Sequence, residues 1–171
     1  SKEYHWRIDP RQSGLNTLSI GLLVEWVHRW FGSTARIDAL IKTAISKRRD
    51  PADGTMREIE YPDIVMIHGE MTSGAVARYE FSGVHQGAPE QTIEVYGRDG
   101  MLRYYPENGA IVGARNGVDL SPIAVPDDMV RRWQVEAEWI AAIRGEDPDA
   151  FPHGRGNPTF EDGLRYMDVS E

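Results

Sequence analysis

Cysteine is missing from all 171 residues of the chain, which excludes a disulfide framework, a thiolate metal site and a cysteine nucleophile. Basic residues are also scarce. Against 27 Asp and Glu stand only 19 Lys and Arg, so the formal net charge is −8. A protein that binds a nucleic-acid backbone needs a basic face, so we expect no nucleic-acid partner.

Long hydrophobic runs are missing as well. The apolar run at residues 20–24 is broken by Glu25, far short of the roughly 20 apolar residues of a membrane span. The first ten residues, SKEYHWRIDP, contain no apolar signal core. We therefore expect no membrane partner and a cytoplasmic location. A third missing pattern is G-x-G-x-x-G, without which the chain cannot bind a dinucleotide by a Rossmann fingerprint of its own.

Hydrophobic periodicity predicts helices at both ends of the chain and strands between them. The helices are expected at about 15–31, at 127–144, and from Thr159 onward, where Thr159 and Asp162 form a capping box. Strands are expected at 36–46, 64–71, 75–81, 91–96, 101–105 and 110–112, with a polar turn region at 47–63. For 36–46 a helix is the alternative, because Ala, Leu and Lys are good helix formers. Phe160, Leu164 and Met167 are the expected apolar residues of the last helix.

Short links between strands predict antiparallel pairing, and helices segregated from strands predict an α+β fold. We expect one domain, residues 1–171, with an open-faced, mainly antiparallel sheet and helices on one face. The strands look too apolar for the other face to contact only water, so that face is a predicted dimerisation surface. The residues on which this depends are Val65, Ile67, Val76, Tyr79, Phe81, Ile93, Val95, Leu102 and Tyr104.

Histidines offer little recognisable chemistry. Glu25 and His28 are spaced to pair on the first helix, but H-E-x-x-H is missing and no metal site is predicted. His85 lies in the loop at 82–87. Loop residues carried by a sheet often contact ligands, so His85 is a substrate-binding candidate, with an ordinary loop histidine as the alternative.

Four stretches together resemble a known family. They are WRIDPRQSG followed by a helix ending in EWVHRWFG, the hairpin IEVYGRDGMLRYYPENG, the helix WQVEAEWIAAIRGE, and the terminal PTFEDGLRYMDVSE. In this order, over nearly the whole chain, they resemble the C-terminal domain of the glucose–fructose oxidoreductase, inositol dehydrogenase and rhizopine-catabolism (Gfo/Idh/MocA) oxidoreductases.

The resemblance implies a role for the chain. Members of this family join an N-terminal Rossmann domain for NAD or NADP to a C-terminal α+β domain that contacts the substrate and forms the oligomer interface. The chain is thus expected to be the substrate-binding and oligomerisation domain of an NAD(P)-dependent oxidoreductase acting on a sugar, a polyol or a related small hydroxy compound. Without the Rossmann domain and its catalytic lysine, the fragment should bind no cofactor, show no activity alone, and form a homo-oligomer through the open sheet face.

The first helix departs from the family pattern Asp-x-Gly-x-His-x-x-Asp. The resemblance places Leu18, Ile20, Leu22 and Glu25 at those four positions, and only Glu25 keeps the chemistry. Leu22 stands where the family has its proton-transfer histidine, and a leucine cannot move a proton, so no catalytic residue is assigned. A non-catalytic binding or assembly module and an NAD-dependent glycosidase remain alternatives. The substrate-binding candidates are Arg7, Asp9, Arg11, Asn16, Glu25 and His85.

Overall fold

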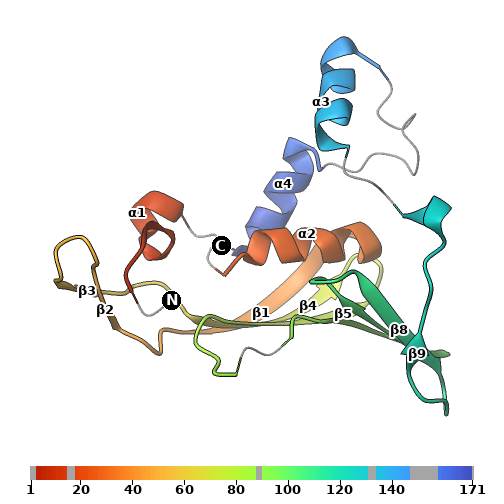
Figure 1. Ribbon diagram of the computed structural model, residues 1–171, viewed down its shortest axis with the longest axis horizontal. Coiled ribbons are helices and arrows are strands. Elements are labelled where there is room, and N and C mark those ends of the chain that lie inside the picture. The colour runs from red at the N-terminus through yellow and green to blue at the C-terminus, as the bar shows by residue number, and fades with distance from the viewer. Residues whose placement is uncertain (1–2, 15–17, 88–89, 131–133, 147–157, 171) are drawn as a thin grey trace. The chain divides into compact units, whose positions relative to one another are not determined.

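A computed structural model of the chain describes residues 3–14, 18–87, 90–130, 134–146 and 158–170 (Figure 1). The contacts divide the chain into two compact units. The first comprises residues 1–85 and 158–171, and the second comprises residues 86–157. Both pair their strands in antiparallel fashion, and the fold is α+β as predicted.

The first unit is built on a three-stranded sheet in the order β1-β4-β5, with β1 at Thr34–Lys42, β4 at Ile64–Met71 and β5 at Val76–Ser82. Ile67 at the middle of β4 lies opposite Ala39 on one side and Tyr79 on the other. All three strands were predicted from alternation, because a sheet with one buried face selects apolar residues at every second position.

Helix α2, at Ile20–Phe31, lies along one face of this sheet (Figure 1). Its buried side chains pack with the apolar face of β4 and β5 into a core. The Tyr79 and Phe81 rings stack there with centroids 6.1 Å apart. The buried members of this core are Ile20, Val24, Val65, Ile67, Tyr79, Phe81 and Val169.

The start of α2 differs from the prediction. The helix begins at Ile20 rather than Leu15, because Leu18 and Ser19 have φ angles of 53° and 58° in the left-handed region, which a right-handed helix cannot contain. Residues 15–17 lie outside the described residues. Apolar periodicity continued through this segment, so the sequence showed no sign of the turn.

The other face of the sheet mixes charged and apolar residues, so it is less apolar than expected. Val65, Ile67, Tyr79 and Phe81 all belong to the core beneath α2. Because side chains alternate along a strand, the opposite face carries the intervening residues. They are Arg36, Asp38, Leu40 and Lys42 on β1, Ile64, Met66, His68 and Glu70 on β4, and Val76, Arg78, Glu80 and Ser82 on β5. Of the residues expected to form an apolar outer surface of this sheet, only Val76 lies on this face.

The segment predicted as a polar turn region contains a small hairpin. Strands β2, at Lys47–Arg49, and β3, at Met56–Glu58, pair in antiparallel fashion. Pro51 and Asp53-Gly54 lie in the turn between them. The N-terminal segment adds to this hairpin through a bridge from Glu3 to Arg49 and then forms η1, at Trp6–Ile8, and α1, at Pro10–Ser13.

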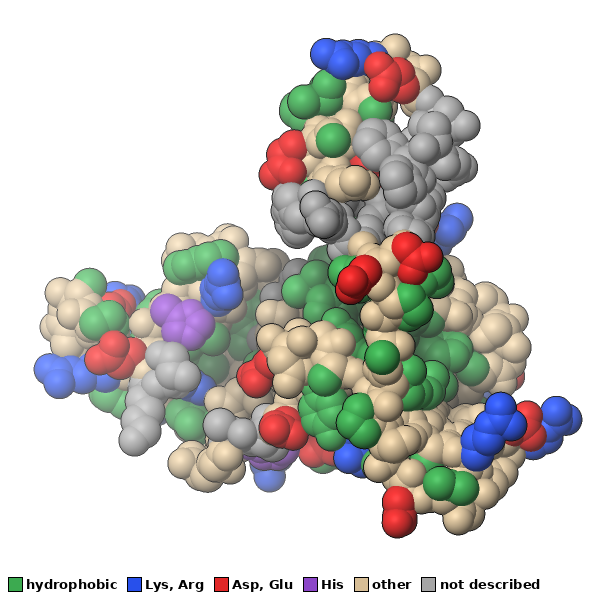
Figure 2. Space-filling view, turned by 45° about the vertical axis from the view of Figure 1, so that its right-hand side comes forward, with side chains coloured by type: hydrophobic (Ala, Val, Ile, Leu, Met, Phe, Trp, Pro, Cys, Tyr) green, Lys and Arg blue, Asp and Glu red, His purple; other side chains and the backbone are tan. Residues whose placement is uncertain are grey.

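The chain's last helix confirms the predicted capping box. Helix α4, at Phe160–Met167, has the Thr159 hydroxyl accepting the Asp162 N–H at 3.1 Å and an Asp162 carboxylate oxygen accepting the Thr159 N–H at 2.9 Å. It is followed by η4, at Asp168–Ser170, which contributes Val169 to the core. Phe160 and Leu164, expected on the packed side, are instead 98% and 66% exposed. Hydrophobic side chains are seen at the surface in Figure 2.

The second unit holds a four-stranded sheet in the order β6-β7-β8-β9. Its strands span Ile93–Gly97, Gly100–Tyr105, Ala110–Arg115 and Ser121–Pro122. The predicted hairpin at 91–105 is confirmed, and β8 extends three residues further than expected. A Cβ on Gly113 would lie 2.7 Å from Ile123 Cδ1 and 2.8 Å from Leu102 Cδ2, so the glycine permits this close packing.

The helix predicted at 127–144 is divided. Its start is the short helix η2, at Asp127–Met129, after which Val130 is extended. Helix α3 spans only Val135–Arg144 and ends at Gly145, which is in the left-handed conformation with φ 73°. Residues 131–133 lie outside the described residues.

No helix in the described ranges has the length and hydrophobicity needed to cross a membrane.

Candidate functional site

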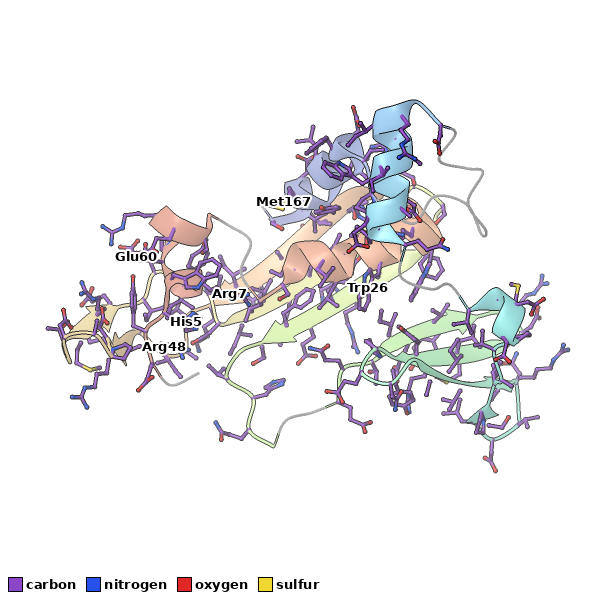
Figure 3. All side chains as sticks on the ribbon, turned by 45° about the horizontal axis from the view of Figure 1, so that its top comes forward. His5, Arg7, Trp26, Arg48, Glu60 and Met167 are labelled. Atoms are coloured by element: carbon purple, nitrogen blue, oxygen red, sulfur yellow. The ribbon has the colours of Figure 1, made fainter. Side chains whose placement is uncertain are left out.

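A cavity of about 230 Å³ opens between the N-terminal segment and the β2–β3 hairpin, within the first unit. It is lined by Tyr4, Ile8, Asp9, Pro10, Arg11, Glu58 and Glu60. In Figure 3, Glu60 lies on the hairpin side of α1. His5, Arg7 and Arg48 are labelled in the same part of the first unit, near α1 and the β2–β3 hairpin. Asp9 and Arg11 are substrate-binding residues predicted from the sequence, and this cavity brings them together.

Asp9 is a buried polar group of the cavity and is held by several hydrogen bonds. It caps α1, where its carboxylate accepts the Arg11 backbone N–H at 3.0 Å and the Gln12 amide at 3.1 Å, and it is only 6% exposed. Hydrogen bonds from Gln12, from the Arg11 backbone and from the Tyr4 hydroxyl lower the pKa of Asp9 to about 2. The carboxylate is therefore ionised and fixed in place near neutral pH.

Arg11 reaches back to the same carboxylate. Its Nε lies 3.3 Å from Asp9 Oδ1, while the rest of its side chain is largely exposed. The hydrogen bond to Asp9 raises the pKa of Arg11. Four donors already surround the buried Asp9 carboxylate, so it holds Arg11 in place, and the exposed guanidinium N–H groups of Arg11 can donate to the hydroxyls of a polyhydroxylated molecule.

Two glutamates supply the hairpin side of the cavity. Glu58 and Glu60 are two residues apart, whereas Ile59 and Tyr61 alternate with them and are buried, 7% and 4% exposed. The sequence analysis missed both glutamates. The signal was present in the alternation of REIEY at 57–61, but Asp53-Gly54 and Pro62 dominated the interpretation as a turn region.

Arg57 holds the hairpin against the N-terminal segment. Its guanidinium carbon lies 5.7 Å from the centre of the Tyr4 ring, and its nitrogens bind Asp50 at 2.6 Å and Asp53 at 3.0 Å. The hydrogen bond to Asp50 is the main cause that raises the pKa of Arg57. Burial first, and then Asp9, raise the pKa of Tyr4, so its hydroxyl stays protonated at neutral pH.

Three other predicted residues, Arg7, Glu25 and His85, do not line this cavity. Arg7 is exposed, with its guanidinium carbon 5.1 Å from the centre of the Trp6 ring. Glu25 is buried on α2 and pairs with Arg29 one turn later. His85 Nε2 is 4.0 Å from Glu80 Oε1 at the end of β5. Asn16 lies outside the described residues.

Leu22, at the position where the resemblance expects a histidine, is 56% exposed on α2. His28 on the same helix is held by a hydrogen bond between its Nε2 and the Thr34 hydroxyl at 2.9 Å, and burial lowers its pKa. Within the described residues, no three His, Asp or Glu side chains are placed to hold a metal ion.

Comparison with known proteins gives fold matches only. No protein-family model matches the sequence, and no curated protein matches it. Among solved structures, levoglucosan dehydrogenase in complex with NADH and L-sorbose matches with a TM-score of 0.73 and 17% identity, over 98% of this chain and 50% of that one. The chain therefore shares its fold with about half of this oxidoreductase, in agreement with the expected resemblance to the C-terminal domain of the Gfo/Idh/MocA oxidoreductases.

Two further structures agree with this assignment of the C-terminal domain fold. An oxidoreductase domain protein from Kribbella flavida has a TM-score of 0.73 and 18% identity, over 98% of this chain and 49% of that one. An NAD binding oxidoreductase from Klebsiella pneumoniae has a TM-score of 0.63 and 21% identity, over 98% and 43%. The chain spans about half the length of the structures it matches.

Proposed function

We propose that the chain is the substrate-binding domain of an NAD- or NADP-dependent oxidoreductase that acts on a sugar, a polyol or a related hydroxy compound. The observation that carries this proposal is the match of nearly the whole chain to half of a levoglucosan dehydrogenase whose structure contains NADH and L-sorbose. Domain boundaries at residues 1 and 171 and the cytoplasmic location stay predictions.

In this proposal the cofactor is held elsewhere in the parent protein. In the described part of the chain, no helix follows a strand through a glycine-rich turn of the kind that cradles a pyrophosphate; α2, for example, follows Leu18 and Ser19 instead. The nicotinamide would supply the hydride chemistry. The residues of this chain would orient the hydroxyl-bearing ligand and exclude water, with Arg11, held in place by Asp9, donating to a hydroxyl.

The parent protein provides the direct test. The full-length protein is incubated with NAD or NADP and a panel of sugars and polyols, and formation of the reduced nicotinamide is followed by absorbance. We expect turnover with at least one of them. If the full-length protein binds the cofactor and reduces none of it with any member of the panel, the proposal is wrong.

The 171-residue chain gives a second test of where the cofactor binds. Calorimetric titration with NAD and NADP is expected to show no binding, because the chain lacks the phosphate-binding turn. Binding at micromolar concentration would show that the chain itself holds the cofactor. That result would contradict the proposal that another part of the parent protein binds it.

The second candidate is a non-catalytic binding or assembly module with the same fold. Leu22 favours it, because a leucine at the position where the resemblance expects the proton-transfer histidine removes a proton donor. The module would form a homo-oligomer without substrate-dependent chemistry. Light scattering tests this assembly, and a strict monomer at high concentration would count against it.

Assembly through the uncovered face of the β1-β4-β5 sheet should depend on salt. That face carries charged residues such as Arg36, Lys42 and Arg78 beside the apolar Leu40 and Val76, so contacts between two copies would be partly ionic. Exposed ion pairs are screened at high ionic strength. We expect the oligomer to weaken as salt is added, whereas an apolar interface would not.

A further inference from the structure

The cavity beside α1 carries more negative charge than its own ion pairs cancel. Arg11 is engaged by Asp9 at 3.3 Å, and Lys47 lies 3.4 Å from Glu58. Glu60 lines the same cavity, is exposed, and forms no ion pair with any residue in the described ranges. An uncompensated carboxylate is therefore presented to whatever enters the cavity.

The nearby arginines do not neutralise Glu60. Arg57, beside the Tyr4 ring, is bound to Asp50 and Asp53 on the outer side of the hairpin. Arg48 is buried, 5% exposed, and forms an ion pair with Asp63 at 3.8 Å. Both cations are thus committed to carboxylates outside the cavity.

The remaining walls suit the body of a small ring-shaped ligand. Tyr4, Ile8 and Pro10 provide apolar surface, on which the C–H face of a sugar or cyclic polyol can pack. The Arg11 guanidinium, held by the Asp9 carboxylate, is placed to donate hydrogen bonds to hydroxyls. Apolar packing, hydroxyl partners and an uncompensated carboxylate thus meet in one cavity.

We infer that this cavity selects a ligand that carries a protonated amino group as well as hydroxyls, that is, an amino sugar or an amino polyol, with Glu60 as the partner of the ammonium group. This inference rests on the proposed function and names the substrate class of the same protein. A ligand with its own carboxylate or phosphate is disfavoured, because the uncompensated Glu60 carboxylate would face it with like charge.

Three matched probes test the charge preference. D-glucosamine, D-glucose and D-glucuronate are titrated into the chain near pH 6, where glutamate and the amino sugar are both charged. Backbone amide shifts of Tyr4, Ile8 and Arg11 report binding. Glucosamine should bind about two- to fivefold more tightly than glucose, the range expected for one exposed ion pair, and glucuronate most weakly.

The Glu60→Gln variant tests whether Glu60 causes the preference for glucosamine over glucose. The variant keeps the shape of the side chain and should reduce the glucosamine preference to nothing, while Glu80→Gln, on the outer face of β5, should keep it. The wild-type preference should also shrink at high salt. Equal binding of glucosamine and glucose, no binding of any probe at these amides, or a preference that survives Glu60→Gln would each overturn the inference.

The outcomes separate this inference from the proposed function. If the full-length protein oxidises neutral sugars and the chain shows no charge preference, the inference fails and the proposed function stands. If the chain prefers glucosamine through Glu60 but the full-length protein reduces no cofactor with any sugar, the binding site stands and the proposed oxidoreductase activity fails.

Discussion

The Arg57 guanidinium carbon lies 5.7 Å from the centre of the Tyr4 ring, and the same side chain binds Asp50 at 2.6 Å. This contact joins the β2–β3 hairpin to the N-terminal segment that carries Asp9 and Arg11. The Tyr4 N–H also donates to the Arg49 carbonyl at 2.9 Å. Two segments more than forty positions apart in sequence thus form the walls of one cavity.

Arg57→Ala should loosen this junction. Loss of the contact with the Tyr4 ring and of the ion pair with Asp50 leaves the N-terminal segment held chiefly by backbone hydrogen bonds. Hydrogen exchange at the Tyr4 amide should become about two- to fivefold faster, as expected for loss of an exposed cation–π contact. Arg98→Ala, an exposed arginine in the second unit, is the control and should leave this amide unchanged.

Acid should weaken the Asp9 cap of helix α1 only at very low pH. The folded pKa of Asp9 is about 2, below its ordinary value of 3.8, so its contribution to stability is present above pH 3.8 and is lost as the pH falls through 2. The Arg11 and Gln12 amide shifts should therefore hold until the pH falls below 3.8 and then titrate with a midpoint near 2. A titration midpoint at or above pH 3.8 would show that hydrogen bonds do not lower the pKa of Asp9.

Asp9→Asn separates charge from capping at the same site. Asparagine also caps helices, so α1 should persist, but the acid titration of the Arg11 and Gln12 amides should disappear. A variant that still titrates near pH 2 would assign the transition to another carboxylate.

Substitutions at two adjacent residues at the start of α4 should change the free energy of unfolding by different amounts. Thr159→Ala removes the hydroxyl that accepts the Asp162 N–H and should lower the free energy of unfolding by about 0.5–2 kcal/mol. Phe160→Ala should change it by less than about 0.5 kcal/mol, because the ring is 98% exposed. Urea denaturation measures both; a larger loss for Phe160→Ala would mean that the ring is covered in solution.

Gly113→Ala should destabilise the second unit. The new methyl group would lie 2.7 Å from Ile123 Cδ1 and 2.8 Å from Leu102 Cδ2, and overpacking of this kind costs about 1–3 kcal/mol. Adding Ile123→Val removes one of the clashing atoms and should recover part of the loss. Amide exchange in β7 and β8 locates the effect, and an unchanged exchange rate in both strands would contradict the close packing.

Local periodicity predicted the strands of both units and the capping box at Thr159, because each depends on neighbouring residues in the chain. The cavity depends on pairing between distant segments. Nothing at Glu58 or Glu60 indicates that Tyr4 and Asp9 lie opposite them, and the short β2 and β3 strands give little alternation to detect. The break at Leu18 and Ser19 was likewise hidden within a continuous apolar pattern.

Tyr79 provides a test of the core beneath α2 at alkaline pH. Its ring is buried, its hydroxyl has no hydrogen-bond partner among the described residues, and burial raises its pKa to about 12 from 10.0. The unfolded chain releases this proton more readily, so stability is full below pH 10 and is lost as the pH rises from 10 towards 12.

Tyr79→Phe removes both the unpaired hydroxyl and the titration, and should leave stability at pH 7 equal or higher. Its midpoint of alkaline unfolding should shift upward, whereas Tyr96→Phe, an exposed tyrosine bonded to Glu94, should leave the midpoint unchanged. A drop in stability at neutral pH would show that the Tyr79 hydroxyl has a partner in solution.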